Sequence, residues 1–217
     1  DFTGSCFKNV VFRQCNFTDV IWRGATLDKV TFKECVFQDT IFECLSAHQV
    51  LFERFTMKNC DFRNAKAPGL NLSAGGIKSC VFDGAILNES HWEDVQVDRS
   101  QARGCLFEDA LFRECGFRNV DLTAADFTVA TWDQVHFEDV SFLSITARGM
   151  LVKKAFFKNN SFLKADCRNA VGLSYAMKKV IREHGGAVSG EYLHAVWYSR
   201  LGRVMLILTA SLAVVLF

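Results

Sequence analysis

Apolar side chains, most of them large, recur at every fifth residue from Phe2 to Cys167. None of these 34 consecutive positions is polar, and they hold 18 of the 21 Phe in the chain. An α-helix repeats every ~3.6 residues and a strand every two, so neither keeps a period of five in phase over this length. The pattern therefore predicts a solenoid built from five-residue units.

A second column of small or moderately apolar residues lies two positions before each large one. Val10, Cys15 and Ala25 belong to it, and the three positions between the columns are mostly charged or polar. Where the large site shrinks, the small site often grows, as where Ala47 follows Leu45. Because a close-packed interior keeps its volume roughly constant, both columns are predicted to line one interior.

The five-residue unit resembles that of the pentapeptide-repeat family, in which a small residue, Asp or Asn, Leu or Phe and two polar residues follow one another. Residues 15–19 and 125–129 match this unit best, and the resemblance covers residues 1–170. It implies an all-β solenoid, a right-handed quadrilateral β-helix with four units per coil. The 34 units then make about eight coils, and a spacing of ~4.8 Å gives a rod roughly 40 Å long.

The large column supplies the expected structural core. Its representative members are Phe12, Phe17, Phe32, Phe37, Phe112, Phe117, Phe137 and Phe142. The pattern is weakest over residues 67–76, which contain the only Pro and three Gly of the chain. We interpret this stretch as a tight or irregular coil in preference to a local ligand site, because Gly in a strand more often marks a bulge.

The chain divides into three predicted segments: a pentapeptide-repeat β-helix over 1–171, a helical cap or hairpin over 172–203 and an apolar helix over 204–217. The pattern of 173–184 is typical of an amphipathic helix ended by Gly185 and Gly186, and 189–203 is predicted to form a second helix. This C-terminal α-helical segment is expected to cover the open end of the solenoid. It is similar to the helical hairpin that follows pentapeptide repeats in some bacterial membrane proteins.

Residues 204–217 contain no charged side chain. The run is shorter than the ~20 residues of a membrane span, so a partial span, a short anchor and a buried cap remain open. Trp197, Tyr198, Arg200 and Arg203 precede it and resemble a membrane interface with basic flanks, which favours membrane insertion. The arginines indicate the cytoplasmic face of a membrane, with a soluble cytoplasmic or a luminal or extracellular location as alternatives.

Nine Cys and a balanced charge narrow the possible functions. Six Cys occupy the small column and are predicted to be buried, reduced thiols, while Cys6 and Cys44 point outward. Pairs on neighbouring coils, such as Cys15 and Cys35, are expected to have parallel Cα–Cβ bonds, a geometry that is unfavourable for a disulfide. Free thiols are typical of a reducing compartment, which we therefore expect for this protein. The chain has 25 basic and 24 acidic residues, a balance that argues against nucleic-acid binding.

No zinc-ligand spacing, nucleophile–base arrangement or phosphate-binding Gly motif occurs in the sequence. We therefore expect no catalytic, cofactor-binding or metal-binding residue and no small-molecule substrate. The predicted function is a non-enzymatic scaffold, tethered to a membrane by the apolar segment and binding an unidentified protein partner. One alternative is a DNA mimic that binds topoisomerase, against which stands the lack of a visible acidic column. The other is an extracytoplasmic or cytosolic module of a larger membrane protein or effector.

Overall fold

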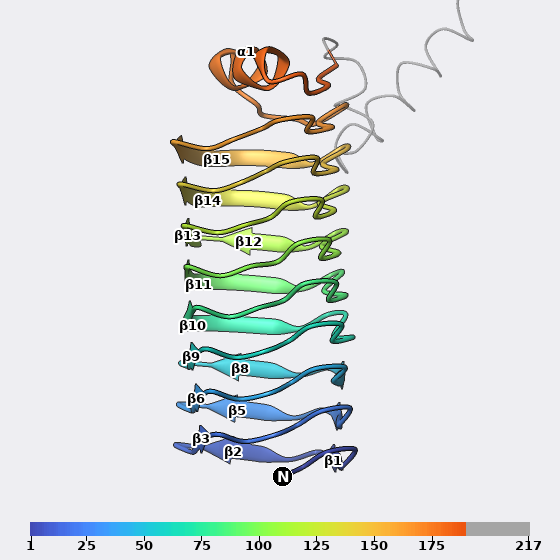
Figure 1. Cartoon of the computed structure of the whole chain (residues 1–217), viewed down its shortest axis with the longest axis vertical. Helices are drawn as coiled ribbons and strands as arrows, with labels where there is room; N and C mark the ends of the chain where they lie inside the picture. The colour runs from blue at the N-terminus through green and yellow to red at the C-terminus, as the bar shows by residue number, and fades with distance from the viewer. Residues whose placement is uncertain (190–217) are drawn as a thin grey trace, which may run out of the picture.

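The computed structural model describes residues 1–189 and shows a straight rod of stacked coils with one helix lying across its upper end (Figure 1). The chain is a β-solenoid of about eight turns with a C-terminal helix, which confirms the predicted fold class. Residues 20 apart lie in register on neighbouring coils, as where Phe32 pairs with Phe12 below and Phe52 above in parallel ladders. The second predicted helix and the apolar segment 204–217 lie outside the described residues.

Strands on three of the four faces build the rod. They are β1 (Cys6–Lys8), β2 (Val11–Arg13), β3 (Asn16–Thr18), β4 (Thr26–Asp28), β5 (Thr31–Lys33), β6 (Val36–Gln38), β7 (Ser46–His48), β8 (Leu51–Glu53), β9 (Thr56–Lys58), β10 (Asn71–Lys78), β11 (His91–Asp98), β12 (Leu111–Arg113), β13 (Gly116–Arg118), β14 (Thr131–Glu138) and β15 (Leu151–Lys158).

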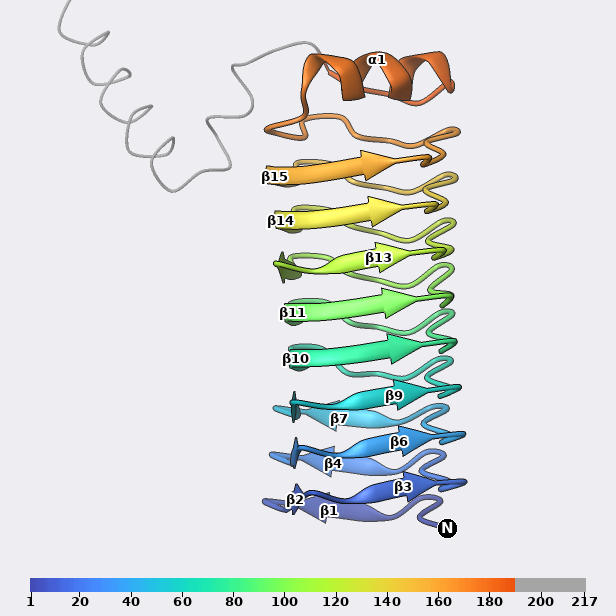
Figure 2. The same cartoon turned by 90° about the vertical axis from the view of Figure 1, so that its left-hand side faces the viewer.

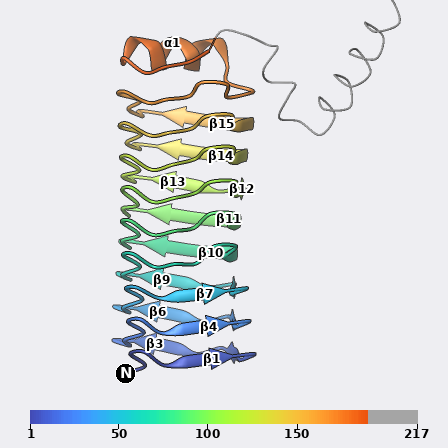
Figure 3. The same ribbon diagram turned by 90° about the vertical axis from the view of Figure 1, so that its right-hand side faces the viewer.

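We name the faces A to D after the order in which each coil passes through them. Their inward positions recur every 20 residues, starting at Phe2 for face A, Phe7 for B, Phe12 for C and Phe17 for D. Strands β1, β4 and β7 open face B (Figure 3), and β3, β6, β9 and β13 stack on face D (Figure 2). Face A and the upper part of face B pair through single parallel bridges.

All but one of the units turn at a residue in the left-handed region of backbone conformation. From Gly4 to Asn169 each fifth residue except Lys154 has a φ between 48° and 67°. At Ala67 the turn has Pro68 and Gly69 at its centre, and the Leu70 N–H donates to the Ala67 carbonyl at 3.2 Å. Pro followed by a left-handed Gly is the preferred pair of a type II turn, so the weak stretch forms an ordinary coil here.

The interior is a set of aromatic stacks that run along the rod axis. Phe32 and Phe52 lie 4.7 Å apart and nearly parallel, and Phe142 and Phe162 lie 4.8 Å apart. Seven of the eight representative core residues are buried: Phe17, Phe32, Phe37, Phe112, Phe117, Phe137 and Phe142. Phe12 is only partly buried, because it lies in the first coil and has a neighbouring layer on one side.

Gly75 lies in the small column because the coil below it carries a Phe at the equivalent position. A Cβ built on Gly75 would lie 2.2 Å from the Phe55 ring, which is itself buried. The large residue of one coil therefore fills the volume that the next coil leaves empty. The contact explains why position 75 is a glycine. Side-chain volume is compensated here between neighbouring coils, whereas the sequence pattern predicted compensation within one unit.

The segment that contains helix α1 (Tyr175–Glu183) closes the upper end of the described rod. The helix begins at Ser174, whose side chain accepts a hydrogen bond from the Met177 N–H, and it buries Ile181 completely. These bounds agree with the helix predicted over 173–184. Beyond α1, the Ala187 N–H donates to the Ala165 carbonyl at 2.8 Å, which covers part of the last coil's edge. Within residues 1–189, no helix has the length and apolar character needed to cross a membrane.

Candidate functional site

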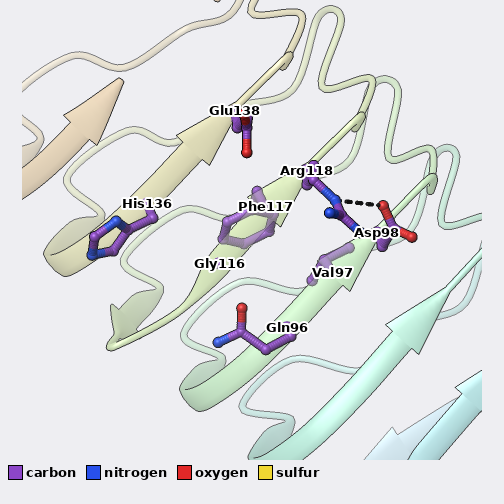
Figure 4. Close-up of a pocket in the computed structure, with 8 residues that line it drawn as sticks. All are labelled: Gln96, Val97, Asp98, Gly116, Phe117, Arg118, His136 and Glu138. Carbon is purple, nitrogen blue, oxygen red and sulfur yellow. Dashed lines mark hydrogen bonds and ion pairs between the residues drawn. The ribbon is translucent and has the colours of Figure 1, made fainter. Parts of the chain in front are cut away.

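A shallow hollow of about 370 Å³ opens on face D, where an outward column lacks one side chain (Figure 4). Gly116 lies between Gln96 on β11 and His136 on β14, so Phe117 forms part of the floor. The Arg118 guanidinium pairs with Asp98 at 3.2 Å on one edge. The ionic groups around the hollow are engaged at the surface, Arg118 with Asp98 and Glu138 with Lys158, and Gln96 and His136 complete its polar lining.

Thiols are the potentially nucleophilic side chains of the interior, and burial suppresses the ionisation of two of them. All nine cysteines are free, and Cys35, Cys60, Cys80, Cys105, Cys115 and Cys167 are buried. Burial raises the pKa of Cys115 and of Cys167 to about 12, so neither forms a thiolate near neutral pH. Cys15 differs from the prediction for its column, since its place in the first coil leaves it partly exposed.

Across residues 1–189 the structure brings together no group of three or more His, Cys, Asp or Glu side chains that could hold a metal ion. Most ionic contacts instead join one coil to the next. Lys33 contacts Glu53 at 3.0 Å on face C, and Arg23 contacts Glu43 at 2.9 Å on face A. Faces A, C and D therefore carry mixed charge that is largely paired along the axis.

Face B departs from this pattern in its middle three coils. Its outward side chains between Lys66 and Arg148 include no Lys or Arg. The same stretch carries four carboxylates, which we call the acidic strip: Glu89, Glu108, Asp109 and Asp126. Of the Lys and Arg side chains in residues 1–189, none forms a salt bridge with the strip. The sequence analysis missed this acidic strip because its members come from three units, 85–89, 105–109 and 125–129, that share a face only when the coils stack.

Charge is also segregated along the rod. Residues 83–139 contain 13 Asp and Glu against four Lys and Arg, while residues 140–189 contain two against nine. Residues 1–82 are nearly balanced, with eight acidic and ten basic side chains. A count over the whole repeat hides these opposing sections, because their charges largely cancel.

The upper end of the rod combines basic and exposed apolar side chains. Tyr175 on α1 is 81% exposed and Phe156 on β15 is 57% exposed. Between α1 and the last coil lies an apolar hollow of about 300 Å³, floored by Phe157 and Phe162. The predicted membrane-interface residues Trp197, Tyr198, Arg200 and Arg203 fall outside the described residues, so their role stays a prediction.

Residues 1–43 and 93–128 match the family model for pentapeptide repeats, in eight copies. These two stretches of the chain are pentapeptide repeats. The repeat geometry continues through residues 44–92, which the family model does not cover, since β10 pairs in register with β8, β9 and β11. Phe55 and Gly75 lie in this stretch and depart from the usual occupants of the small column.

Several solved structures resemble this repeat solenoid. QnrB1, a plasmid-mediated fluoroquinolone resistance protein, is 12% identical over 87% of this chain and 92% of its own, with a TM-score of 0.41. HetL from the cyanobacterium Nostoc is 11% identical, over 76% of this chain and 83% of its own, with a TM-score of 0.23. A protein from the Arabidopsis thaliana thylakoid lumen is 18% identical over 60% of this chain and 83% of its own, with a TM-score of 0.22. No curated protein matches the sequence at a significant level.

Proposed function

We propose that this pentapeptide-repeat scaffold is non-enzymatic, is held at the cytoplasmic face of a membrane by its C-terminal segment, and binds a basic protein partner through the acidic strip. The observation that carries the partner's chemistry is that no Lys or Arg of residues 1–189 forms a salt bridge with the strip, in which only Asp126 has a local side-chain partner, Thr128. Glu89, Glu108 and Asp109 are exposed on two stacked coils and Asp126 is half-buried on the next, and parallel bridges join the backbone of these three coils. A rigid row of like charge attracts a partner of opposite charge and fixes its orientation.

Apolar side chains give the strip a second means of contact. Leu106 is 37% exposed between the carboxylates, and Ile86 and Val129 flank it on the same face. A polar rim around modest apolar area is the usual composition of a non-obligate protein interface. The strip therefore favours a protein partner over a small ion, which would need ligands converging on one point.

The strip is tested with a fluorescent Lys/Arg-rich peptide and two matched variants of the full chain. E89Q/E108Q/D109N/D126N removes four charges from face B, and E34Q/E53Q/E93Q/E114Q removes four from face C. We expect the first variant to weaken binding at least tenfold and the second by less than about threefold, since the face C carboxylates Glu34, Glu53 and Glu93 already have basic partners. Equal losses in the two variants would mean that the peptide senses net charge and not the strip.

Membrane attachment rests on the uncharged run 204–217 and the aromatic and basic residues before it. Deleting residues 204–217 should abolish flotation with neutral phosphatidylcholine vesicles and leave the melting temperature of the solenoid almost unchanged. Unchanged flotation with a large fall in melting temperature would make the segment a structural cap. The protein would then be a scaffold without this membrane attachment.

The acidic strip also favours a second function, a DNA mimic that binds type II topoisomerase. A row of carboxylates on a rod presents charge in the manner of a phosphate backbone. A supercoiling assay with a purified type II topoisomerase separates the two functions, because a membrane-held scaffold for another partner leaves the enzyme unaffected. Inhibition that disappears in E89Q/E108Q/D109N/D126N would replace our proposal with the DNA mimic.

A further inference from the structure

The last coil carries a basic side chain on each of its four faces. Lys154 lies on face C, Lys158 on face D, Lys164 on face A and Arg168 on face B, and all four are exposed. Helix α1 lies across the end of the rod and adds Lys178, Lys179 and Arg182 (Figure 1). The basic groups thus form a collar around the rod's end, whereas a side-on interface would need them on one face.

Several of these charges are free to meet an external anion. Arg168 pairs with Asp166, Lys158 with Glu138 and Lys179 with Glu183. Among the described residues 1–189, by contrast, no acidic side chain forms a salt bridge with Lys154, Lys164, Lys178 or Arg182. These four residues come from two faces of the last coil and from α1, so the unpaired charge surrounds the end.

Exposed apolar side chains gather at the same end. Of the seven large hydrophobic residues that are exposed in residues 1–189, four lie in this region: Phe156, Leu163, Tyr175 and Val180. Tyr175 is 81% exposed and follows the helix cap, and Leu163 is 46% exposed beside Lys164. Lys and Arg with aromatic and aliphatic neighbours are the composition that enters the headgroup layer of a membrane.

The path of the chain leads to the same place. Ser189, the last residue described, bonds through its hydroxyl to the Asn169 N–H at 2.7 Å on the final coil. The chain therefore leaves the described structure at this end of the rod, and the uncharged run 204–217 follows later in the sequence. A segment that enters a bilayer from here brings the collar to the membrane surface.

We propose that the C-terminal end of the rod docks end-on against a lipid surface bearing anionic headgroups, with Lys154, Lys164, Lys178 and Arg182 contacting the phosphate and carboxylate groups. The proposal deepens the membrane attachment proposed above and rests on it. Anionic lipids attract basic groups near their surface by roughly a fivefold gain in binding per charge. The acidic middle of the rod is repelled by the same surface, so standing upright keeps the acidic strip away from the membrane and open to a partner.

Binding of the full chain to vesicles with and without phosphatidylserine tests the lipid specificity. We expect at least a tenfold preference for the anionic vesicles, lost in K154Q/K164Q/K178Q/R182Q and reduced by added salt. The matched control K29Q/K58Q/K66Q/K78Q removes four lysines that lack salt bridges in residues 1–189 and should keep the preference within about twofold. No preference, or an equal loss in both variants, would overturn the proposal.

This outcome is separable from that of the apolar tether. The tether is judged by flotation with neutral vesicles after deletion of 204–217, and the collar by the ratio of anionic to neutral binding. Orientation has its own measurement, since neutron reflectometry on a supported anionic bilayer should give a protein layer roughly 40 Å thick for eight coils standing upright. A thinner layer, with the width of one coil, would show that the rod lies flat and that the end-on geometry is wrong.

Discussion

At the scale of single residues, the solenoid contains backbone conformations that the sequence of a single five-residue unit does not explain. The left-handed turn residue is Gly in only a few units, and Val129 adopts a φ of 52° although a β-branched side chain disfavours that region. The ladders on both sides hold these turns in place, as where the Val129 N–H donates to the Arg148 carbonyl at 2.9 Å. The stack thus tolerates local strain that a lone turn would relieve.

Gly75 provides a direct test of contact between coils. Gly75→Ala should destabilise the protein by about 1–3 kcal/mol, because its Cβ would overlap the buried Phe55 ring of the coil below. Phe55→Ala should cost about 3–5 kcal/mol by opening a cavity. The double variant F55A/G75A should cost less than the sum of the two, measured by denaturant unfolding. Strictly additive costs would show that the two positions do not share one volume.

Thiol reactivity tests burial one residue at a time. Cys6 and Cys44 are exposed and should be alkylated first by iodoacetamide under native conditions, followed by the partly exposed Cys15. Cys115 and Cys167, whose pKa values burial raises to about 12, should stay unmodified until the protein is unfolded. Mass spectrometry of peptides gives the order. Early labelling of Cys115 would contradict the inward orientation of the small column.

At the scale of elements, the structure repeats coil by coil, and only the helical cap at the C-terminal end departs from this repeat. Asp166 in the last coil accepts hydrogen bonds from Arg168 and Arg148, at 2.7 Å to each guanidinium, while its backbone bridges to Ala187 beyond α1. The two guanidinium groups hold the pKa of Asp166 well below its usual range. One carboxylate therefore links the last full coil to the chain that closes it.

Asp166→Asn should lower stability at neutral pH by about 0.5–1 kcal/mol, a small value because the partner arginines are exposed. A carboxyl whose pKa is depressed on folding stabilises the protein above its unfolded pKa, near 3.9, and loses this effect as the pH falls through the folded value. The two proteins should therefore converge in acid, as followed by thermal melts across pH. Asp19→Asn, at an exposed carboxylate without a salt bridge in residues 1–189, serves as the control. A difference that persists in acid would point to lost contacts of the cap and not to charge.

Sequence alone gave the period of five, the two inward columns and the helix near 173–184, because each depends on neighbours close in the chain. Contacts between coils could not be predicted in this way, because they join residues that are 20 positions apart. The glycine at position 75 is explained only by the Phe55 ring, 20 residues earlier, which occupies the space that a larger side chain would need. The partial exposure of Phe12 likewise depends on its place in the first coil. The acidic strip was hidden for the same reason, since its carboxylates are scattered in sequence and meet only when the coils stack.

At the scale of the whole molecule, the distribution of charge gives the rod a direction. Its acidic middle and basic C-terminal section form a permanent asymmetry along the axis. The acidic side chains of the middle section repel one another. Asp109, for example, lies one coil above Glu89 at the same corner. Like charges that face each other on neighbouring strands are destabilising. Unrelieved repulsion in an otherwise regular fold is expected where selection acts on function.

Asp109→Lys tests this reading of the strip, since it replaces a repulsion with an attraction to Glu89. The left-handed position accepts Lys, as Lys29 and Lys164 occupy equivalent corners. We expect the free energy of unfolding to rise by about 0.2–1 kcal/mol, more at low salt than at high salt, while affinity for the Lys/Arg-rich peptide falls. Asp109→Asn removes the repulsion without adding an attraction and should fall between the two proteins in denaturant unfolding. A loss of stability in Asp109→Lys at low salt would mean that the strip carries no electrostatic cost, and its charge would then need no functional explanation.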